Sequence, residues 1–175
     1  CTMPNLDPVP DTPEHLQVQL DAIKKDAVIE VLPFASITVG EKGEMLVPFT
    51  ELAENCVGFS DDGRGVQSAA LMKEAMRRCA ACDKLISAHC EDNSLAGGVI
   101  HAGKKAEQFG IKGIPSDSEY LPVIRDIALA AETGARYHIC HVSAAETVEA
   151  VRRGKMAGVR VTCEVTPHQI ALCED

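Results

Sequence analysis

Short apolar runs and longer stretches of helical periodicity alternate along the chain. The apolar runs, rich in Val, Ile and Ala, cover residues 27–39, 56–60, 84–89, 136–142 and 159–165. Near-continuous apolar runs of this length are typical of strands in a parallel sheet that is covered on both faces. The first run is expected to be a buried strand that Pro33 interrupts.

Amphipathic helices are predicted between these runs. They cover residues 11–26, 66–84, 116–134 and 143–158. The last two open with a Ser followed three residues later by a Glu, which predicts capping boxes of Ser116 with Glu119 and of Ser143 with Glu146. Pro122 lies too deep for a first turn, so it is expected to kink its helix or to delay the start.

The order of the elements predicts an α/β fold with a parallel sheet, because repeated strand–helix units form βαβ crossovers. A flavodoxin-like open sheet would fit the length, whereas a (β/α)₈ barrel needs ~250 residues, so the chain could form only part of one. Residues 92–115, with five glycines and weak periodicity, lie where an active-site loop is expected. Neither a GxGxxG phosphate loop nor a GxSxG nucleophile motif is present.

Composition narrows the classes of partner. The net charge of −9 over 175 residues argues against a nucleic-acid partner. No apolar run reaches the ~20 residues of a membrane span, and the N-terminus has no signal-peptide pattern. Most of the eight cysteines lie in apolar or helical runs, which suits a reduced cytoplasmic protein. Cys79 and Cys82 form a CxxC inside a predicted helix, where packing is favoured over a zinc or redox role.

Polar clusters terminate three successive predicted strands. The pair Asp61–Asp62 ends one run, His89 ends the next, and His141 ends a third. The carboxyl ends of parallel strands face the functional site in α/β folds. Aspartate and histidine are the ligands that zinc takes at hydrolytic sites, so these residues predict a metal site.

Strand alternation discriminates within these clusters. His138 and His141 are an odd number of residues apart, so an unbroken strand would point them to opposite faces. His141, at the strand end, is expected to be the ligand, and His138 to be packed or solvated on the other face. By the same rule Asp61 and Asp62 cannot both aim at one ion from a regular strand.

Other polar residues near the strand ends are candidates for supporting roles. Glu91 and Asp92 follow His89 and could orient its ring, or could be solvated loop acids. Glu164 is an unusual charge within a strand and could support a ligand or line the barrel wall. His168 is either a pocket residue or a loop residue. The remaining histidines are expected at the surface: His15 and His101.

Five ordered motifs resemble a known family. They are "MPNLDPVPDTPE", "GFSDDGRGVQ", "AHCED", "YHICHVSAAETVEAVR" and "VTCEVTPHQI", which run from Met3 to about Leu172. In order and spacing they resemble the class I dihydroorotases, members of the amidohydrolase superfamily. The resemblance implies that residues 1–175 are the central part of a metal-dependent barrel domain. It implies a partial (β/α)₈ TIM-like barrel, from about strand two to strand seven.

The resemblance also implies roles for residues. Asp62 matches a carboxylate that bridges two Zn²⁺ ions, and His89 and His141 match the histidines of the second zinc. Asn5 matches an asparagine that binds the substrate carboxylate, although position alone suggests a turn residue. Hydantoinases and allantoinases use a carboxylated lysine where Asp62 stands, and residues 56–63 contain no Lys.

The remaining machinery of the resembled enzymes is expected outside this chain. Their HxH pair would lie upstream of Cys1, and the strand-eight Asp, the general base, beyond Asp175. No catalytic residue is therefore assigned within the 175 residues, and the isolated chain is expected to be inactive. Glu91, Glu164 and His168 are the candidates for supporting the metal ligands.

The resemblance implies zinc-dependent, reversible hydrolysis of the cyclic amide of dihydroorotate to N-carbamoyl-aspartate, a step of pyrimidine biosynthesis. A homodimer that can associate with aspartate carbamoyltransferase is expected for the complete enzyme. One alternative is a non-catalytic dihydroorotase-like subunit that partners aspartate carbamoyltransferase. Another is a related cyclic amidohydrolase acting on a hydantoin or allantoin.

Overall fold

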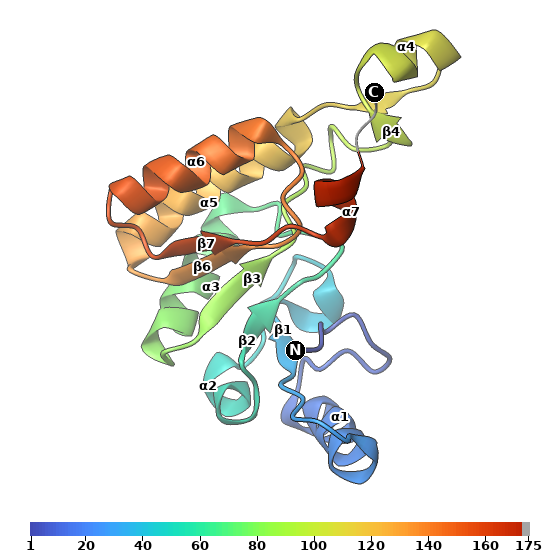
Figure 1. Cartoon of the computed structure of the whole chain (residues 1–175). Helices are drawn as coiled ribbons and strands as arrows, with labels where there is room; N and C mark the ends of the chain where they lie inside the picture. The colour runs from blue at the N-terminus through green and yellow to red at the C-terminus, as the bar shows by residue number, and fades with distance from the viewer. Residues whose placement is uncertain (173–175) are drawn as a thin grey trace.

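The computed structural model describes residues 1–172 of the chain, with a five-stranded sheet at its centre (Figure 1). The strands lie in the order β1-β2-β3-β6-β7, and every neighbouring pair is parallel. Their bounds are β1 Phe34–Ser36, β2 Gly58–Ser60, β3 Leu85–Ala88, β6 Arg136–Ile139 and β7 Val161–Cys163. The predicted α/β class with parallel strands is therefore confirmed.

Helices lie before, between and after the strands. They are α1 Pro13–Asp26, α2 Phe49–Leu52, α3 Ala69–Ala81, α4 Lys104–Phe109, α5 Asp117–Thr133, α6 Ala145–Met156 and α7 Pro167–Ala171, with 3₁₀ turns at Val39–Glu41 and Ala53–Asn55. α3 packs against α5, and α5 against α6, so these three form a row outside the sheet (Figure 1). None of the described helices combines the length and apolarity that a bilayer crossing requires.

The core lies between this row of helices and the sheet. Its side chains include Phe59, Ile86, Tyr137 and Ile139 from the strands and Met72, Met76, Cys79 and Val123 from α3 and α5. Because strand residues alternate, the intervening positions point to the opposite, inner face. Register pairs Ser87 with His138 and His138 with Thr162, so these polar residues share that inner face. Cys79 is fully buried, as expected for a packing cysteine.

The first predicted strand is much shorter than its apolar run. Val28 is 97% exposed and Ile29 is 75% exposed, and only Phe34–Ser36 forms a strand. The neighbouring strand β2 begins at Gly58, opposite Phe34, and the last bond from its side joins the Val57 N–H to the Pro33 carbonyl oxygen (2.8 Å), so it does not reach residues 27–31. Pro33 also lacks the N–H that a longer ladder would need. The expectation of a buried strand from residue 27 is therefore wrong.

Both predicted capping boxes are wrong as well. The side chains of Ser116 and Ser143 do not cap their helices, and Ala144 is the N-cap of α6. Glu119, in the first turn of α5, instead accepts hydrogen bonds from the backbone N–H of Ser143 (2.9 Å) and of Ala144 (3.1 Å). The free N–H groups at the start of α6 are thus bonded by a carboxylate from another helix. The spacing of residues within α6 cannot indicate such a contact. Pro122 lies inside α5 without delaying its start.

The excursion between β3 and α5 forms a small unit that projects from the rest of the molecule (Figure 1). It consists of β4 Ile100–His101, α4 and β5 Gly113–Ile114, with β4 and β5 parallel. A Cβ added to Gly113 would lie 2.3 Å from Ala102 Cα, and one added to Gly98 would lie 2.5 Å from the Gly113 carbonyl carbon. The glycines are therefore needed for the close approach of the two backbones.

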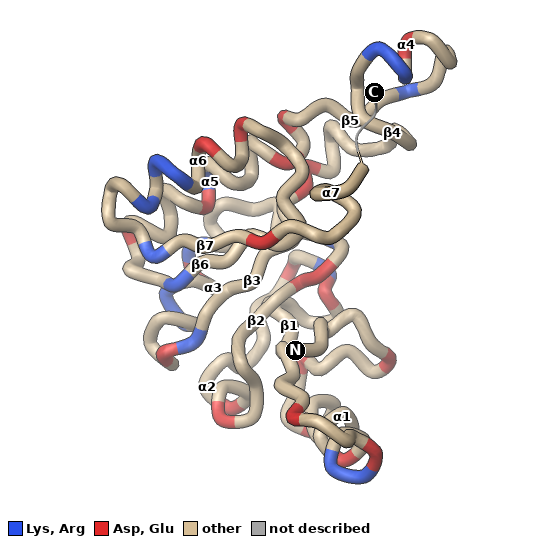
Figure 2. The backbone as a smooth tube through the Cα atoms, viewed as in Figure 1, with Lys and Arg blue, Asp and Glu red and all other residues tan. Residues whose placement is uncertain are grey.

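Many basic residues gather at the amino ends of the strands, where α3 and α6 end, and others lie on α4 and at the end of α1 (Figure 2). This arrangement places positive charge at helix C-termini, where the helix dipole favours it. Arg78 of α3 and Arg153 and Lys155 of α6 are examples. The carboxyl ends of the strands lie at the opposite end of the sheet, and they carry the acidic pair Asp61–Asp62.

Candidate metal centre

Asp62, His89 and His141 converge at the carboxyl ends of three neighbouring strands. Each residue offers one ligand atom, and the three atoms lie within 4.8 Å of one another. Nδ1 of His89 is 3.1 Å from Nε2 of His141. The residues follow β2, β3 and β6, which are adjacent in the sheet, so the topology alone brings them together.

His141 reaches this cluster through a local change in the backbone. β6 ends at Ile139, and His141 has a φ of +38°, in the left-handed region. The strand is therefore broken before His141, and alternation does not decide its direction. His138 lies on the inner face of the sheet, because it pairs with Ser87 in the register. Ser87 is two residues before His89, so it shares the face of that histidine. The expectation that alternation separates the two histidines onto opposite faces does not hold, although His138 is outside the cluster.

The two adjacent aspartates have different surroundings. The buried carboxylate of Asp61 accepts hydrogen bonds from the backbone N–H of Ile37 (2.7 Å) and of Thr38 (3.0 Å) and from Thr38 Oγ1 (2.5 Å). Burial raises the pKa of Asp61, and the hydrogen bonds from Thr38 partly offset this. Asp61 thus fastens the end of β1 to β2, which leaves Asp62 to face the cluster.

Asn5 contacts the cluster from the N-terminal segment. Its Nδ2 donates a hydrogen bond of 3.0 Å to Oδ2 of Asp62, 57 residues further along the chain. An amide that donates to one carboxylate oxygen restricts the rotation of that carboxylate. The structure therefore brings Asn5 to the predicted site.

The residues expected to support the ligands are distributed between two places. Oε2 of Glu91 lies 3.6 Å from Nε2 of His89, within the candidate centre. Glu164 instead lies 3.4 Å from Nε2 of His138. His168 is exposed on α7, and its neighbour Gln169 donates a hydrogen bond of 2.8 Å to the His141 carbonyl oxygen. Sequence reasoning missed Gln169, because a glutamine in a short helix carries no recognisable signal.

Glu41 is a second residue that sequence reasoning did not find. It is buried near Asp61 and Asp62, and its Oε1 has no hydrogen-bond partner. Burial and the negative charge of Asp61 raise the pKa of Glu41 to about 7, while Arg64 opposes the shift. A glutamate in the stretch Gly-Glu-Lys-Gly reads as a turn residue, so nothing in the sequence indicated this environment.

A cavity of about 710 Å³ opens beside the two histidines. His89, Glu91 and His141 line one side, and Ile114 and His101 of the β4–β5 unit line another. The excursion after β3 thus forms a wall of the candidate site, as its position in the sequence predicted. His101 is exposed, as expected, but it also belongs to this wall.

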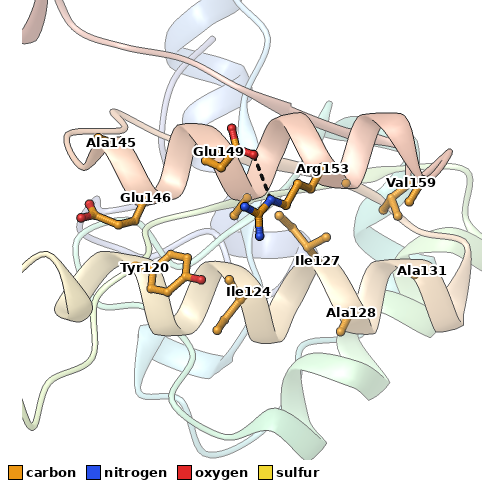
Figure 3. A pocket seen from close by; sticks show the side chains of 13 residues that line it. Tyr120, Ile124, Ile127, Ala128, Ala131, Ala145, Glu146, Glu149, Arg153 and Val159 are labelled. Atoms are coloured by element: carbon orange, nitrogen blue, oxygen red, sulfur yellow. Dashed lines mark hydrogen bonds and ion pairs between the residues drawn. The ribbon is translucent and has the colours of Figure 1, made fainter.

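A second hollow of about 640 Å³ lies between α5 and α6, on the outer side of the sheet (Figure 3). Tyr120, Ile124 and Ile127 form most of its α5 wall, and an ion pair joins Glu149 to Arg153 on α6 (2.9 Å). Its lining is mainly apolar and contains no histidine or cysteine. The chemistry of a metal site is therefore found at the strand ends and not here.

Comparison with known proteins identifies the family. A protein-family model described as "Dihydro-orotase-like" matches residues 1–147 of the chain. The chain belongs to the dihydroorotase-like family. The match covers the segments that carry Asn5, Asp62, His89 and His141.

Curated relatives agree with membership of the dihydroorotase-like family. A dihydroorotase of Fusobacterium nucleatum is 53% identical over 175 residues, 99% of this chain and 41% of that protein. A dihydroorotase of Geobacillus sp. strain WCH70 is 51% identical, over 100% of this chain and 42% of that protein. The chain therefore spans about two fifths of the length of these relatives.

Solved structures support the fold expected for the dihydroorotase-like family. L-hydantoinase (dihydropyrimidinase) from Arthrobacter aurescens matches 95% of this chain and 39% of its own, with a TM-score of 0.74 and 21% identity. D-hydantoinase from Bacillus sp. AR9 matches 91% of this chain and 37% of its own, with a TM-score of 0.68 and 18% identity. At these identities the likeness concerns the fold alone, and it agrees with the predicted partial TIM-like barrel.

Proposed function

We propose that the complete protein is a dihydroorotase and that residues 1–175 form the central part of its barrel domain. It hydrolyses the cyclic amide of dihydroorotate reversibly to N-carbamoyl-aspartate, a step of pyrimidine biosynthesis. The observation that carries the proposal is the convergence of Asp62, His89 and His141 in a chain about 50% identical to dihydroorotases. Dihydroorotases and the related amidohydrolases share one activity, the hydrolysis of cyclic amides.

The donor set of the cluster fits zinc. One carboxylate and two imidazoles, with ligand atoms within 4.8 Å of one another, match the nitrogen and oxygen ligands of catalytic zinc sites. Asp62 would bridge two Zn²⁺ ions, and His89 and His141 would hold one of them. Bound zinc supplies an activated water and polarises the scissile carbonyl.

The protein's own residues set the protonation and direction of these ligands. A histidine ligand must present an unprotonated nitrogen, so Nδ1 of His89 and Nε2 of His141 must each carry a lone pair. The carboxylate of Glu91, 3.6 Å from Nε2 of His89, favours the tautomer with its proton on that nitrogen. Gln169, by binding the carbonyl oxygen of His141, helps to hold the backbone from which that ring projects.

Asn5 can serve both the cluster and the substrate. Its amide group has two N–H donors, and one of them is directed to Asp62. The second is available for the carboxylate of dihydroorotate. The chain is acidic overall, and many of its lysines and arginines lie at the other end of the sheet, while Arg64 and the lysines of α4 lie nearer the site (Figure 2). An anionic substrate therefore depends on local donors such as Asn5 and on the charge of the bound ions.

The proposal extends to the cellular setting of the enzyme. It acts in the cytoplasm on small molecules, as a homodimer that can associate with aspartate carbamoyltransferase. Size measurement of the complete protein, alone and mixed with aspartate carbamoyltransferase, tests both associations.

The activity is tested by assaying the complete protein with dihydroorotate, a hydantoin and allantoin. Hydrolysis of dihydroorotate above the other two is expected, with loss after chelation and recovery on adding Zn²⁺. A His141→Asn variant is expected to be inactive, while His15→Asn, an exposed histidine paired with Asp11, serves as the matched control. Preference for a hydantoin or allantoin would replace the proposed substrate. Inactivity on all three, with zinc bound, would favour a non-catalytic subunit.

A further inference from the structure

A second group of potential ligands lies on the inner face of the sheet, outside the cluster of Asp62, His89 and His141. It consists of His138, Cys140 and Glu164, whose ligand atoms lie within 4.8 Å of one another. His138 belongs to β6, Cys140 follows that strand, and Glu164 follows β7. The two strands are paired in register, with His138 opposite Thr162, so the sheet itself brings the group together.

We propose that His138, Cys140 and Glu164 form a separate site for a zinc-class divalent cation, with the Cys140 thiolate as its distinguishing ligand. This site goes beyond the proposed dihydroorotase activity, which uses only nitrogen and oxygen ligands of this chain. Its ion would join the ends of β6 and β7.

The distances suit such an ion. Zn–N and Zn–O distances of ~2.0–2.1 Å and a Zn–S distance of ~2.3 Å place tetrahedral ligand atoms roughly 3.3–3.7 Å apart. Nε2 of His138 and Oε2 of Glu164 are already 3.4 Å apart. The buried Cys140 Sγ lies within the 4.8 Å limit of both, so a modest movement of the half-exposed Glu164 side chain completes the geometry.

Hydrogen bonds orient two of the three ligands. Nδ1 of His138 is 2.8 Å from Thr162 Oγ1, which leaves Nε2 directed toward Glu164. Metal-binding histidines commonly use their second ring nitrogen in this way. Sγ of Cys140 is 3.0 Å from Ser87 Oγ, a hydroxyl that can donate to a thiolate. Binding of the cation releases the thiol proton of Cys140 to solvent.

The thiolate makes the site distinguishable from the Asp62 cluster. Sulfur ligands favour zinc and other soft ions, and they give Co²⁺ a sulfur-to-metal charge-transfer band that nitrogen and oxygen ligands do not give. Cys90, close to His89 in sequence, has its Sγ 3.2 Å from the Tyr137 hydroxyl in the core. Cys163 is exposed and is opposite Ile139 in the register, so it lies on the other face.

The test is cobalt titration of the complete, metal-free protein, followed by near-ultraviolet absorption. The band is expected in the wild type, and it should be lost in Cys140→Ser. In Glu164→Gln, the cobalt affinity measured from the band should fall by about tenfold or more. Even the loss of a residue that only supports a ligand lowers metal affinity roughly 10- to 100-fold. Glu164 is half-exposed and Cys140 is buried, so Glu164→Gln is the variant that keeps the fold. Circular dichroism checks both variants.

Two controls separate this site from the proposed function. Cys163→Ser removes an exposed cysteine of the neighbouring strand and should leave the band unchanged. His89→Asn should abolish hydrolysis of dihydroorotate and keep the band. Absence of the band in the wild type, or its survival in Cys140→Ser, overturns the proposal. An unchanged cobalt affinity in Glu164→Gln, measured from the band, overturns the assignment of the three-residue site.

Discussion

Nδ1 of His89 lies 3.1 Å from Nε2 of His141, although 52 residues separate the two histidines in the sequence. The two nitrogens face one another because β3 and β6 are neighbours in the sheet and each histidine follows the end of its strand. Two imidazole nitrogens this close are held together either by a shared proton or by a common cation. The pair is therefore the most direct test of metal binding at the strand ends.

Replacing His89 or His141 by Asn should weaken zinc binding by at least the roughly 10- to 100-fold that accompanies loss of an outer partner. The reason is that each variant removes one of the nitrogen ligands at the cluster of three. Competition between the complete protein and a chromogenic chelator measures the change. The exposed His15 is the matched control, and His15→Asn should leave the affinity unchanged. Equal affinities for all variants would exclude the two histidines as ligands.

Arg125 is expected to be important for stability although it lies on α5, away from the ligands. Its guanidinium forms two bonds to the buried carboxylate of Asp126 (2.7 and 3.1 Å) and donates to the carbonyl oxygens of Val66 and Gln67. Arg125→Met would leave Asp126 as a buried charge without its cation and should lower the free energy of unfolding by about 3–5 kcal/mol. Urea denaturation measures this loss.

The control for Arg125 is an exposed arginine. Arg77 of α3 forms an ion pair with Glu74, whose carboxylate Arg78 also binds. Arg77→Met should change the unfolding free energy by no more than about 1 kcal/mol, because exposed ion pairs contribute little. Similar losses in the Arg77 and Arg125 variants would show that the buried carboxylate is not what makes Arg125 matter.

Glu119 is expected to stabilise the start of α6. Its carboxylate accepts from the backbone of Ser143 and Ala144, so Glu119→Ala should cost about 0.5–2 kcal/mol, as loss of a helix cap does. Glu146 has the spacing of a capping box but makes no capping bond in the structure. Glu146→Ala should therefore cost less than about 0.5 kcal/mol. Thermal unfolding measures both losses of stability. A larger loss in Glu146→Ala than in Glu119→Ala would show that the local capping box stabilises α6.

These variants also show where sequence reasoning succeeds and where it fails. Strand ends could be located because a polar residue that closes an apolar run is visible in the sequence, as His89 and Asp62 are. Contacts that depend on tertiary placement could not be located, such as the cap that Glu119 provides to a different helix. The exposed run at Val28 looked like a strand because hydrophobicity does not reveal whether a partner strand lies opposite.

The raised pKa of Glu41 predicts a specific dependence of stability on pH in metal-free protein. Between an unfolded value of about 4.3 and a folded value of about 7, the folded state holds a proton that the unfolded chain has released. Stability contributed by Glu41 is therefore fully present at low pH and is lost as the pH rises through about 7. Glu41→Gln mimics the protonated acid and should lack this loss.

The difference between wild type and Glu41→Gln is measured by denaturation with a chelator present at several pH values. The variant should gain stability relative to the wild type as the pH rises from about 5 to about 8, by up to about 3 kcal/mol. Parallel curves across this range would show that Glu41 titrates at an ordinary pKa. Glu44, an exposed glutamate three residues later, provides the control substitution.

The adjacent aspartates should separate folding from metal binding. Asp61→Ala removes the acceptor of the Ile37 and Thr38 N–H groups and of the Thr38 hydroxyl, all buried. Its unfolding free energy in chelated protein should fall by about 2 kcal/mol or more, because buried donors are left without partners. Asp62 is only partly buried, and its one hydrogen bond in the described chain is from the exposed Asn5. Asp62→Ala should therefore lose zinc with little change in that free energy. Loss of stability in Asp62→Ala, or of zinc alone in Asp61→Ala, would reverse the two roles.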